Sequence, residues 1–299
     1  MTAVPTHPEQ LLGEEFVGWE AIGAEYGYAS TVARLVRADG STCIAKLGSA
    51  QDGRRELFFY RELAPSTPIR VPGFVGGAVE GERSLVLLEE VTGARQGDAE
   101  DRRVGDALPV LLEMARLHRT WWERAPAELP WWGRSCEAMA ARVRERRPAF
   151  VERWGEHLED HGVLDGLEER LDAARWQAPT TVVHGDLHRD NVLFAAEGPV
   201  VMDWQTVGRG PGAVDVCRWL LEALTVEDRK AREDELLAGY VDELGHGTVD
   251  ALREAVRALT WRMFAGMVGG FAGLDPATCT DRQRRVVAGD LKRVGAVLG

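Results

Sequence analysis

Hydrophobic and polar residues alternate along much of the first 90 positions, and this period of two is typical of half-buried β-strands. Strand-like runs cover Phe16–Ile22, 32–36 and 42–47. The pair Asp39-Gly40 lies between the second and third runs, and Asp-Gly between β-rich segments is a strong hairpin signal. The pattern therefore predicts three consecutive antiparallel strands.

One helix and two further strands are predicted next. Apolar residues recur at helical spacing over 54–63, and Pro65 ends that helix. Strands are predicted at 71–78 and 84–88, and the second is an apolar run that leads into 89–93. The first 90 residues are therefore expected to form a sheet with one helix.

After residue 106 the spacing of apolar positions becomes mainly helical. Helices are predicted over 107–121, in two stretches within 134–176, from Asp215 onward, and over 232–244, 249–274 and 282–298. Between them lie a short strand at 180–183, a hairpin with arms at 192–194 and 199–202, and a loop at 208–212.

These elements predict an α+β fold of two lobes. We expect an N-terminal antiparallel sheet lobe (1–90), a hinge or linker (91–98) and a larger, mainly helical C-terminal lobe (99–299). At 299 residues the chain is long enough for this arrangement and for a sizeable core.

Charge and cysteine content narrow the class of protein. The chain has 36 basic and 48 acidic residues, and a net charge of −12 disfavours nucleic acid or an anionic membrane as a partner. The four cysteines lie far apart without a Cys-x-x-Cys pair, as expected of reduced thiols in the cytoplasm. The first ten residues lack the apolar segment of a signal peptide, and the stretch 263–274 is too short to span a bilayer.

The candidate catalytic and metal-binding residues lie between positions 184 and 204. The chain reads His184-Gly185-Asp186, reaches Asn191 five residues later, and turns near Glu197 before Asp203. A hairpin folded about Glu197 would set Asn191 opposite Asp203, because both lie six positions from it. Amide and carboxylate oxygens suit Mg²⁺, and Asp186 on the preceding loop is free to accept a proton. This is the layout of a phosphoryl-transfer centre.

The same residues carry a family resemblance. His-Gly-Asp-x-x-x-x-Asn, followed by an Asp twelve residues later, resembles the aminoglycoside phosphotransferase and choline kinase-like family, which has the protein-kinase-like fold. The resemblance implies that Asp186 is the catalytic base and that Asn191 and Asp203 hold magnesium. Trp204 stands where kinases have a phenylalanine, which argues against a protein-kinase-style flip of this segment.

Further roles follow from the resemblance. Lys46 would hold the α- and β-phosphates of ATP, and Glu56, four residues before a tyrosine, would pair with it. Apart from the resemblance, the small-residue loop 23–31, which contains Ser30, could lie over the phosphates with backbone N–H groups as donors. It does not match Gly-x-Gly-x-x-Gly, and the alternative is an ordinary turn. The backbone of 89–91, represented by Glu89 and Val91, would bind the adenine edge. Asp215 would brace the catalytic loop through backbone N–H groups, and His184 would fix the same loop by hydrogen bonding.

The expected function is ATP- and Mg²⁺-dependent transfer of a phosphate to a hydroxyl of a small molecule, by a monomer or homodimer. The favoured acceptor is an aminoglycoside or other hydroxylated antibiotic, and the alternative acceptor is a sugar, a choline-like compound or a nucleoside. A rival from another class is a zinc hydrolase, because His184, Asp186 and His188 would share one face if they lay on a strand. His188 could instead contact the loop or the substrate. The absence of an Ala-Pro-Glu segment disfavours a protein kinase.

Overall fold

The computed structural model describes residues 15–22, 31–173 and 179–298, and the chain divides into two compact units. The strand unit consists of Met1–Gly97, Glu128–Pro130 and Asp190–Gly208. The helical unit consists of Asp98–Ala127, Trp131–Arg189 and Arg209–Gly299.

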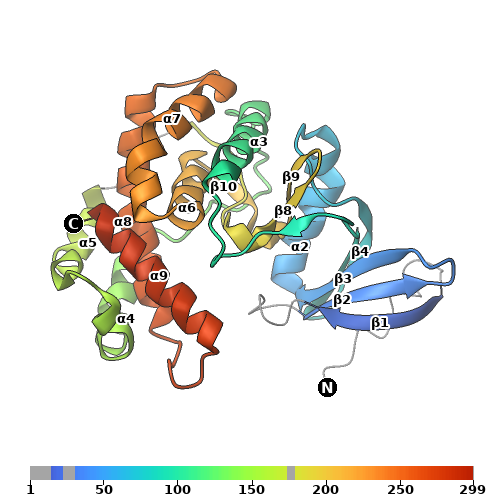
Figure 1. Cartoon of the computed structure of the whole chain (residues 1–299), viewed down its shortest axis with the longest axis horizontal. Coiled ribbons are helices and arrows are strands. Elements are labelled where there is room, and N and C mark those ends of the chain that lie inside the picture. The colour runs from blue at the N-terminus through green and yellow to red at the C-terminus, as the bar shows by residue number, and fades with distance from the viewer. Residues whose placement is uncertain (1–14, 23–30, 174–178, 299) are drawn as a thin grey trace. The chain divides into compact units, whose positions relative to one another are not determined.

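The strand unit contains a five-stranded antiparallel sheet, in the order β1-β2-β3-β5-β4 (Figure 1). Its strands are β1 (Phe16–Ile22), β2 (Thr31–Arg37), β3 (Thr42–Ser49), β4 (Phe74–Glu80) and β5 (Arg83–Glu89). Together with the helical second unit, this sheet confirms the predicted α+β fold with a strand-rich N-terminal part.

Alternation along β3 explains how one strand serves both the core and the cavity described below. Cys43 and Ala45 are buried in a cluster with Leu35, Leu85 and Leu87. Ile44 and Lys46 therefore point to the opposite face, because successive side chains on a strand alternate. The turn before β3 uses Gly40 at φ 83°, a backbone conformation that glycine adopts without steric cost.

The helix after β3 begins four residues earlier than predicted. Helix α2 (Ala50–Phe58) starts at Ser49, whose side chain accepts a hydrogen bond from the backbone N–H of Asp52. A serine followed three residues later by an acid is a helix-start signal that the apolar spacing alone did not reveal. The helix continues over Phe59–Leu63 with π-helical geometry.

The hairpin that carries the predicted metal ligands has a different register from the predicted one. Strands β8 (Val192–Ala195) and β9 (Gly198–Val201) pair Val192 with Val201, and β6 (Arg95–Gln96) pairs with β8. The N–H of Met202 donates to the carbonyl of Asn191 at 3.0 Å, so Asn191 lies opposite Met202 and not Asp203. The turn is centred between Ala196 and Glu197, which shifts the pairing by one residue.

Helices dominate the second unit (Figure 1). They are α3 (Ala107–Thr120), α4 (Cys136–Trp154), α5 (Leu167–Ala173), α6 (Ala213–Ala223), α7 (Val226–Leu244), α8 (Val249–Phe271) and α9 (Asp281–Leu298). Strand β10 (Gly208–Gly210), which was predicted as a loop, pairs with β7 (Thr181–Val183). Within the described ranges, no helix combines the length and the apolar character needed to cross a bilayer.

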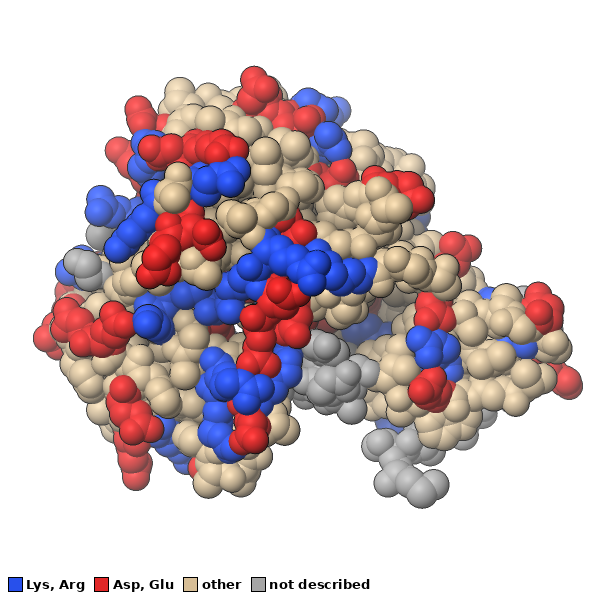
Figure 2. Space-filling view, in the orientation of Figure 1, with Lys and Arg blue, Asp and Glu red and all other residues tan. Residues whose placement is uncertain are grey.

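Acidic and basic side chains are interspersed over the face of the molecule drawn in Figure 2. The net charge of −12 is therefore not gathered into one acidic patch on that face.

Candidate active site

A cavity of about 370 Å³ lies within the strand unit. It brings together six of the residues predicted to bind nucleotide or metal: Lys46, Glu56, Glu89, Val91, Asn191 and Asp203. Ser30, predicted to lie near the phosphates, falls outside the described residues. The sheet, helix α2 and the β8–β9 hairpin with the residues that follow it each supply part of the lining, and Lys46 and Asp203, which are in contact, are 157 residues apart in the chain.

Lys46 is shared by two carboxylates at the polar end of this cavity. Its Nζ lies 2.9 Å from Oε2 of Glu56 and also contacts the carboxylate of Asp203. Burial alone would lower the pKa of Lys46, but the charges of Glu56 and Asp203 outweigh it and raise that pKa. Burial raises the pKa of Glu56, whose side chain is only 2% exposed. The lysine therefore stays charged and bridges helix α2 to the segment after β9.

Asp203 adopts a backbone conformation that is uncommon outside glycine. Its φ and ψ are 64° and 63°, in the left-handed region that Asp and Asn tolerate better than other residues. Trp204 follows, fully buried, with its ring stacked on Phe59 at a centroid distance of 3.7 Å. The indole N–H of Trp204 also donates to the carbonyl of Val201 at 3.1 Å. This packing holds the carboxylate of Asp203 at the cavity while its neighbour is fixed in the core.

The lining of the cavity has an apolar part and a strongly acidic part. The apolar part includes Ile22, Val32, Ile44, Leu88, Leu193 and Met202. The charged side chains among the described lining are Arg34 and Lys46 against Glu56, Glu89, Glu90, Asp190 and Asp203. With two basic and five acidic side chains, the cavity repels a polyanion that carries no bound cation, and it attracts cations.

The loop that carries Asp186 belongs to the helical unit and is held by Asp215 on α6. The Asp215 carboxylate accepts hydrogen bonds from the backbone N–H groups of His184 at 2.8 Å and Gly185 at 2.9 Å. His118 Nε2 lies 3.1 Å from the same carboxylate, and the Tyr240 hydroxyl lies 2.7 Å from His118 Nδ1. All of these side chains are buried, so the loop is fixed by a network from three helices.

Asp186 itself is 40% exposed at the side chain, in contrast to the buried groups that hold its loop. Its backbone N–H donates to His184 Nδ1 at 3.3 Å. His188 Nε2 lies 3.7 Å and Arg218 Nη2 lies 3.5 Å from its carboxylate oxygens. Burial works to raise the pKa of Asp186, but the charges of His188 and Arg218 outweigh it and hold that pKa below its usual range. The carboxylate is therefore ionised at neutral pH.

The zinc arrangement required by the hydrolase hypothesis depends on a strand through residues 184–188. Strand β7 ends at Val183, and Gly185 has φ 84°, so these residues form a loop. Among the residues that the structure describes, no group of three or more His, Cys, Asp or Glu side chains is placed to hold a metal ion. Nothing in this geometry favours the hydrolase.

A family comparison decides the class of protein. A model of the phosphotransferase enzyme family matches residues 26–285, which is most of the chain. The chain belongs to this family. The stretch matched contains every residue to which the sequence resemblance assigned a role, and it includes parts of both units.

Solved structures show that members of several phosphotransferase groups share this fold. A macrolide 2'-phosphotransferase from Brachybacterium faecium is 20% identical, with 93% of this chain and 94% of that chain covered and a TM-score of 0.57. A spectinomycin phosphotransferase in complex with ADP and spectinomycin is 13% identical, with 97% and 94% covered and a TM-score of 0.65.

A choline/ethanolamine kinase family protein from Mesorhizobium loti is 18% identical, with 94% and 88% covered and a TM-score of 0.65. At these identities the likeness establishes the fold and not the substrate. No curated protein matches the chain significantly.

Several contacts of this family member were not foreseen from its sequence. Arg189 is fully buried beside the Asp186 loop, and it donates to the carbonyl of Asp98 at 3.0 Å and to the carboxylate of Asp106 at 2.8 Å. The indole N–H of Trp132 donates to the carbonyl of Gly185 at 3.1 Å. The contact of Arg218 with Asp186 at 3.5 Å has no local signal in the sequence.

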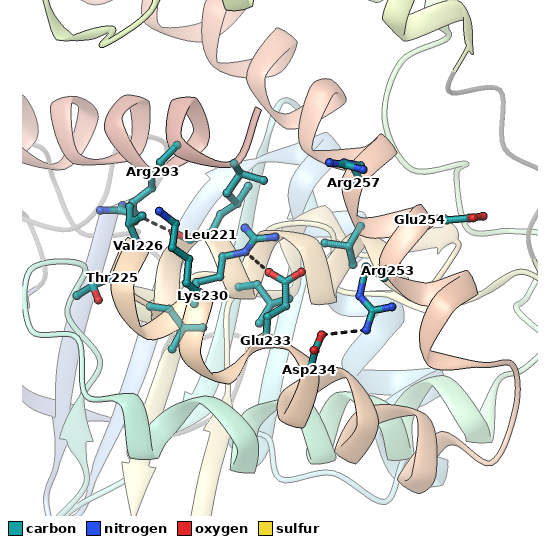
Figure 3. Close-up of a pocket in the computed structure, with 16 residues that line it drawn as sticks. Leu221, Thr225, Val226, Lys230, Glu233, Asp234, Arg253, Glu254, Arg257 and Arg293 are labelled. Carbon is teal, nitrogen blue, oxygen red and sulfur yellow. Dashed lines mark hydrogen bonds and ion pairs between the residues drawn. The ribbon is translucent and has the colours of Figure 1, made fainter. Parts of the chain in front are cut away.

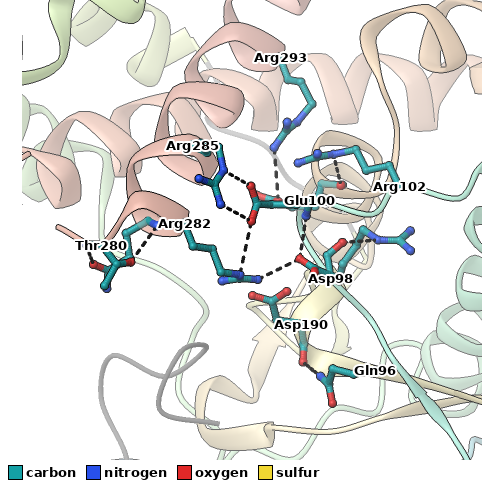
Figure 4. Close-up of polar contacts among 12 residues, drawn as sticks. Gln96, Asp98, Glu100, Arg102, Asp190, Thr280, Arg282, Arg285 and Arg293 are labelled. Atoms are coloured by element: carbon teal, nitrogen blue, oxygen red, sulfur yellow. Dashed lines mark hydrogen bonds and ion pairs between the residues drawn. The ribbon is translucent and has the colours of Figure 1, made fainter.

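The segment that follows Gly97 is tied to the C-terminal helix of the same unit. Figure 4 shows Arg282 and Arg285 of α9 directed at Asp98 and Glu100, at 3.1 Å in both cases. Because the carbonyl of Asp98 also receives Arg189, these ion pairs extend the support of the Asp186 loop to α9.

Proposed function

We propose that this phosphotransferase is an ATP- and Mg²⁺-dependent kinase that transfers the γ-phosphate to a hydroxyl of a small molecule. The single observation that carries the proposal is the cavity in which Lys46, Asn191 and Asp203 meet. A lysine, an amide and a carboxylate at one end of an otherwise apolar cavity form a donor set that suits a metal–triphosphate complex.

The charge of the lining supports a requirement for a divalent cation. Five acidic side chains against two basic ones would repel a bare triphosphate. Asn191 and Asp203 would hold Mg²⁺, which, when bound, neutralises phosphate charge that the protein leaves uncompensated. Lys46 would then keep its hydrogen bond to Glu56 and replace its contact with Asp203 by one with the phosphates.

The apolar part of the same cavity suits a purine base. Leu88 lies directly before residues 89–91, at which the resemblance expects the base edge, and Val91 is one of those residues. The backbone N–H of Glu89 already donates to the carbonyl of Gly73 at 2.8 Å, so base recognition would fall to the other backbone groups of 89–91. This assignment explains why an acidic cavity also has apolar lining residues.

Asp186 would act as the base that receives the proton of the acceptor hydroxyl. It is ionised at neutral pH, its side chain is accessible, and its loop is fixed through Asp215. Those three properties are what a positioned general base needs. His188 and Arg218 would orient its carboxylate.

For the acceptor we propose an aminoglycoside or another hydroxylated antibiotic, supported by the macrolide and spectinomycin phosphotransferases among proteins of the same fold. A cytoplasmic location would match the supply of ATP and the four free cysteines. A sugar, a choline-like amino alcohol or a nucleoside is the second class of acceptor, supported by the choline/ethanolamine kinase family protein of the same fold.

The test is an ATP-consumption screen with Mg²⁺ across aminoglycosides, macrolides, nucleoside antibiotics, hexoses and amino alcohols, with mass spectrometry of the products. We expect one class to gain 80 Da, the mass of a transferred phosphoryl group, with matching release of ADP. Absence of a phosphorylated product from every class, together with absence of Mg²⁺-ATP binding, would overturn the proposal.

The matched variant for this screen is Asp186→Asn, which keeps the side-chain shape and removes the base. We expect turnover to fall by about 10²–10⁴-fold, the usual contribution of a positioned base. Nucleotide affinity should stay within a factor of two, since Asp186 is not among the residues that line the cavity. Turnover close to that of the original protein would remove Asp186 from the role of base.

A further inference from the structure

A second cavity lies wholly within the helical unit, apart from every residue used in the proposed reaction. Its volume is about 450 Å³, which is within the roughly 300–1,000 Å³ range of small-molecule pockets. Residues from α6, α7, α8 and α9 line it (Figure 3). Neither the family match nor the proposed phosphotransfer accounts for it.

The floor of this cavity is apolar and its rim is charged. The apolar lining consists of Leu220, Leu221, Leu224, Val226, Val256, Ala296 and Val297. The charged lining consists of Arg229, Lys230, Arg253, Arg257 and Arg293 against Glu233, Asp234 and Glu254. Five basic groups against three acidic ones stand out in a chain whose acidic residues outnumber the basic ones by 48 to 36.

Two of the five basic side chains are already committed to neighbours. Arg253 pairs with Asp234 at 2.9 Å and also with Asp250. Arg293 donates to the carbonyl of Leu221 at 2.7 Å and pairs with Asp290. These two arginines shape the rim and have little left to offer a ligand.

The other three basic side chains keep unused capacity. Lys230 and Arg257 have no ion-pair or hydrogen-bond partner among the residues that the structure describes, and both are exposed. Arg229 is only 7% exposed, and although it pairs with Glu233, its Nη1 finds no hydrogen-bond partner in the described part of the chain. A buried guanidinium donor without an acceptor is costly, so an added oxygen acceptor would be stabilising there.

The acidic side chains do not cancel this surplus. Glu233 and Asp234 are the partners of Arg229 and Arg253. Figure 3 shows Asp234 directed at Arg253, and Glu254 pointing away from the other residues drawn. The uncommitted charge at this cavity is therefore basic.

We propose that this cavity binds a small organic anion, namely a carboxylate or phosphate monoester on an apolar body. The anionic group would lie among Lys230, Arg257 and Arg229, and the apolar body would cover Leu221, Val226 and Val297. Anionic oxygens form the stronger, charge-assisted class of hydrogen bond with arginine and lysine, and the apolar floor adds burial that inorganic phosphate cannot gain.

The experiment is calorimetric titration of the full chain with octyl phosphate, beside octanol and inorganic phosphate as probes that each lack one half of the ligand. We expect octyl phosphate to bind at least about tenfold more tightly than either partial probe, because both the charge and the apolar contact contribute. Equal affinity for octanol and octyl phosphate would overturn the anionic assignment, and failure of octyl phosphate to bind would overturn the site.

Two variants locate the binding. The double change Lys230→Glu/Arg257→Glu should weaken the binding of octyl phosphate by about tenfold or more, because the new carboxylates would repel the phosphate group. Ala296→Trp, in the last turns of α9, should weaken it similarly by filling the cavity while leaving every charge in place. Arg144→Glu is the control for a single charge reversal outside the cavity, since Arg144 is an exposed arginine on α4, and it is compared with Lys230→Glu and Arg257→Glu made singly.

Unchanged affinity in both cavity variants would place the ligand elsewhere and overturn the proposal. The same follows if Arg144→Glu weakens binding as much as Lys230→Glu and Arg257→Glu made singly, because a general charge effect would then explain the data. Circular dichroism of each variant confirms that it is folded, and Ala296→Trp keeps the test valid even if the charge reversals disturb α7 or α8.

Discussion

The two cavities described above are similar in size but opposite in charge surplus. The cavity of the strand unit, about 370 Å³, has two basic side chains against five acidic ones. The cavity of the helical unit, about 450 Å³, has five basic side chains against three acidic ones. An acidic cavity can take a polyanion only together with a cation, whereas a basic cavity can take an anion alone. Charge balance thus assigns different ligands to two pockets that shape alone would not distinguish.

The cavities also differ in how much of their positive charge is already used. Lys46, the buried cation of the strand unit, is shared between Glu56 and Asp203. Lys230 and Arg257 of the helical unit have no acidic partner among the described residues. A ligand of the first cavity must therefore displace an existing contact of Lys46, and a ligand of the second need not.

The largest effect on folding should come from breaking the Lys46 cluster. Lys46→Met leaves the carboxylate of Glu56 buried without a cation, and removal of one partner from a buried pair costs about 3–5 kcal/mol of unfolding free energy. Chemical denaturation measures this loss. The double variant Lys46→Met/Glu56→Gln should recover much of it, because no buried charge is then left unpaired. A single variant as stable as the original would show that Glu56 is protonated in the folded protein.

The next largest effect should be a pH dependence beside the helical-unit cavity. Burial, together with the charge of Glu222, raises the pKa of Asp290 from 3.8 to about 7. A raised folded pKa stabilises the fold only at low pH, so this contribution is lost as pH rises from about 4 through 7. Asparagine does not titrate, so Asp290→Asn should not show this loss. The unfolding free energy of Asp290→Asn minus that of the original protein should therefore rise by on the order of 2 kcal/mol from pH 5 to pH 8.

Thermal or denaturant unfolding at the two pH values provides the measurement for Asp290. Asp242→Asn, a change at an exposed carboxylate of α7, is the control and should show no such gain. A constant difference between Asp290→Asn and the original at both pH values would mean that Asp290 stays charged throughout.

The smallest effect should come from the rim of the strand-unit cavity. Arg34 forms a bidentate pair with Glu90, from Nε to Oε2 at 3.1 Å and from Nη2 to Oε1 at 2.7 Å, but its side chain is 35% exposed. Water screens such a pair, so Arg34→Ala should change the unfolding free energy by less than about 1 kcal/mol. A loss of stability as large as that of Lys46→Met would show that the rim, and not the buried lysine, organises this cavity.

Local sequence patterns predicted much of the strand unit. The bounds of β1 match those predicted, and the turn before β3 follows from its Asp-Gly pair. Alternation places Ile44 and Lys46 on one face of β3, and both line the cavity. The pairing of Lys46 with Glu56 was implied by the family resemblance, and the structure brings these two side chains together.

Features that depend on one-residue precision or distant packing were not predicted. The β8–β9 register is shifted by one residue because the turn is centred between Ala196 and Glu197, and a hydrophobic pattern does not fix a turn centre. The sequence predicts a loop at 208–212 because Gly208–Gly210 has no apolar run, whereas in the structure these three residues form β10 and pair with β7. The buried contacts of Arg189 join residues 83 or more positions apart, and no local pattern reports them.

The role of the acidic cavity as the site of a metal–nucleotide complex is tested most directly by calorimetric titration of a non-hydrolysable ATP analogue with and without Mg²⁺. The account predicts that Mg²⁺ strengthens binding by at least about tenfold, a coupling of about 1.4 kcal/mol, and that Asp203→Ala abolishes this gain. Equal affinity with and without Mg²⁺, or a Mg²⁺ effect that survives Asp203→Ala, would contradict it.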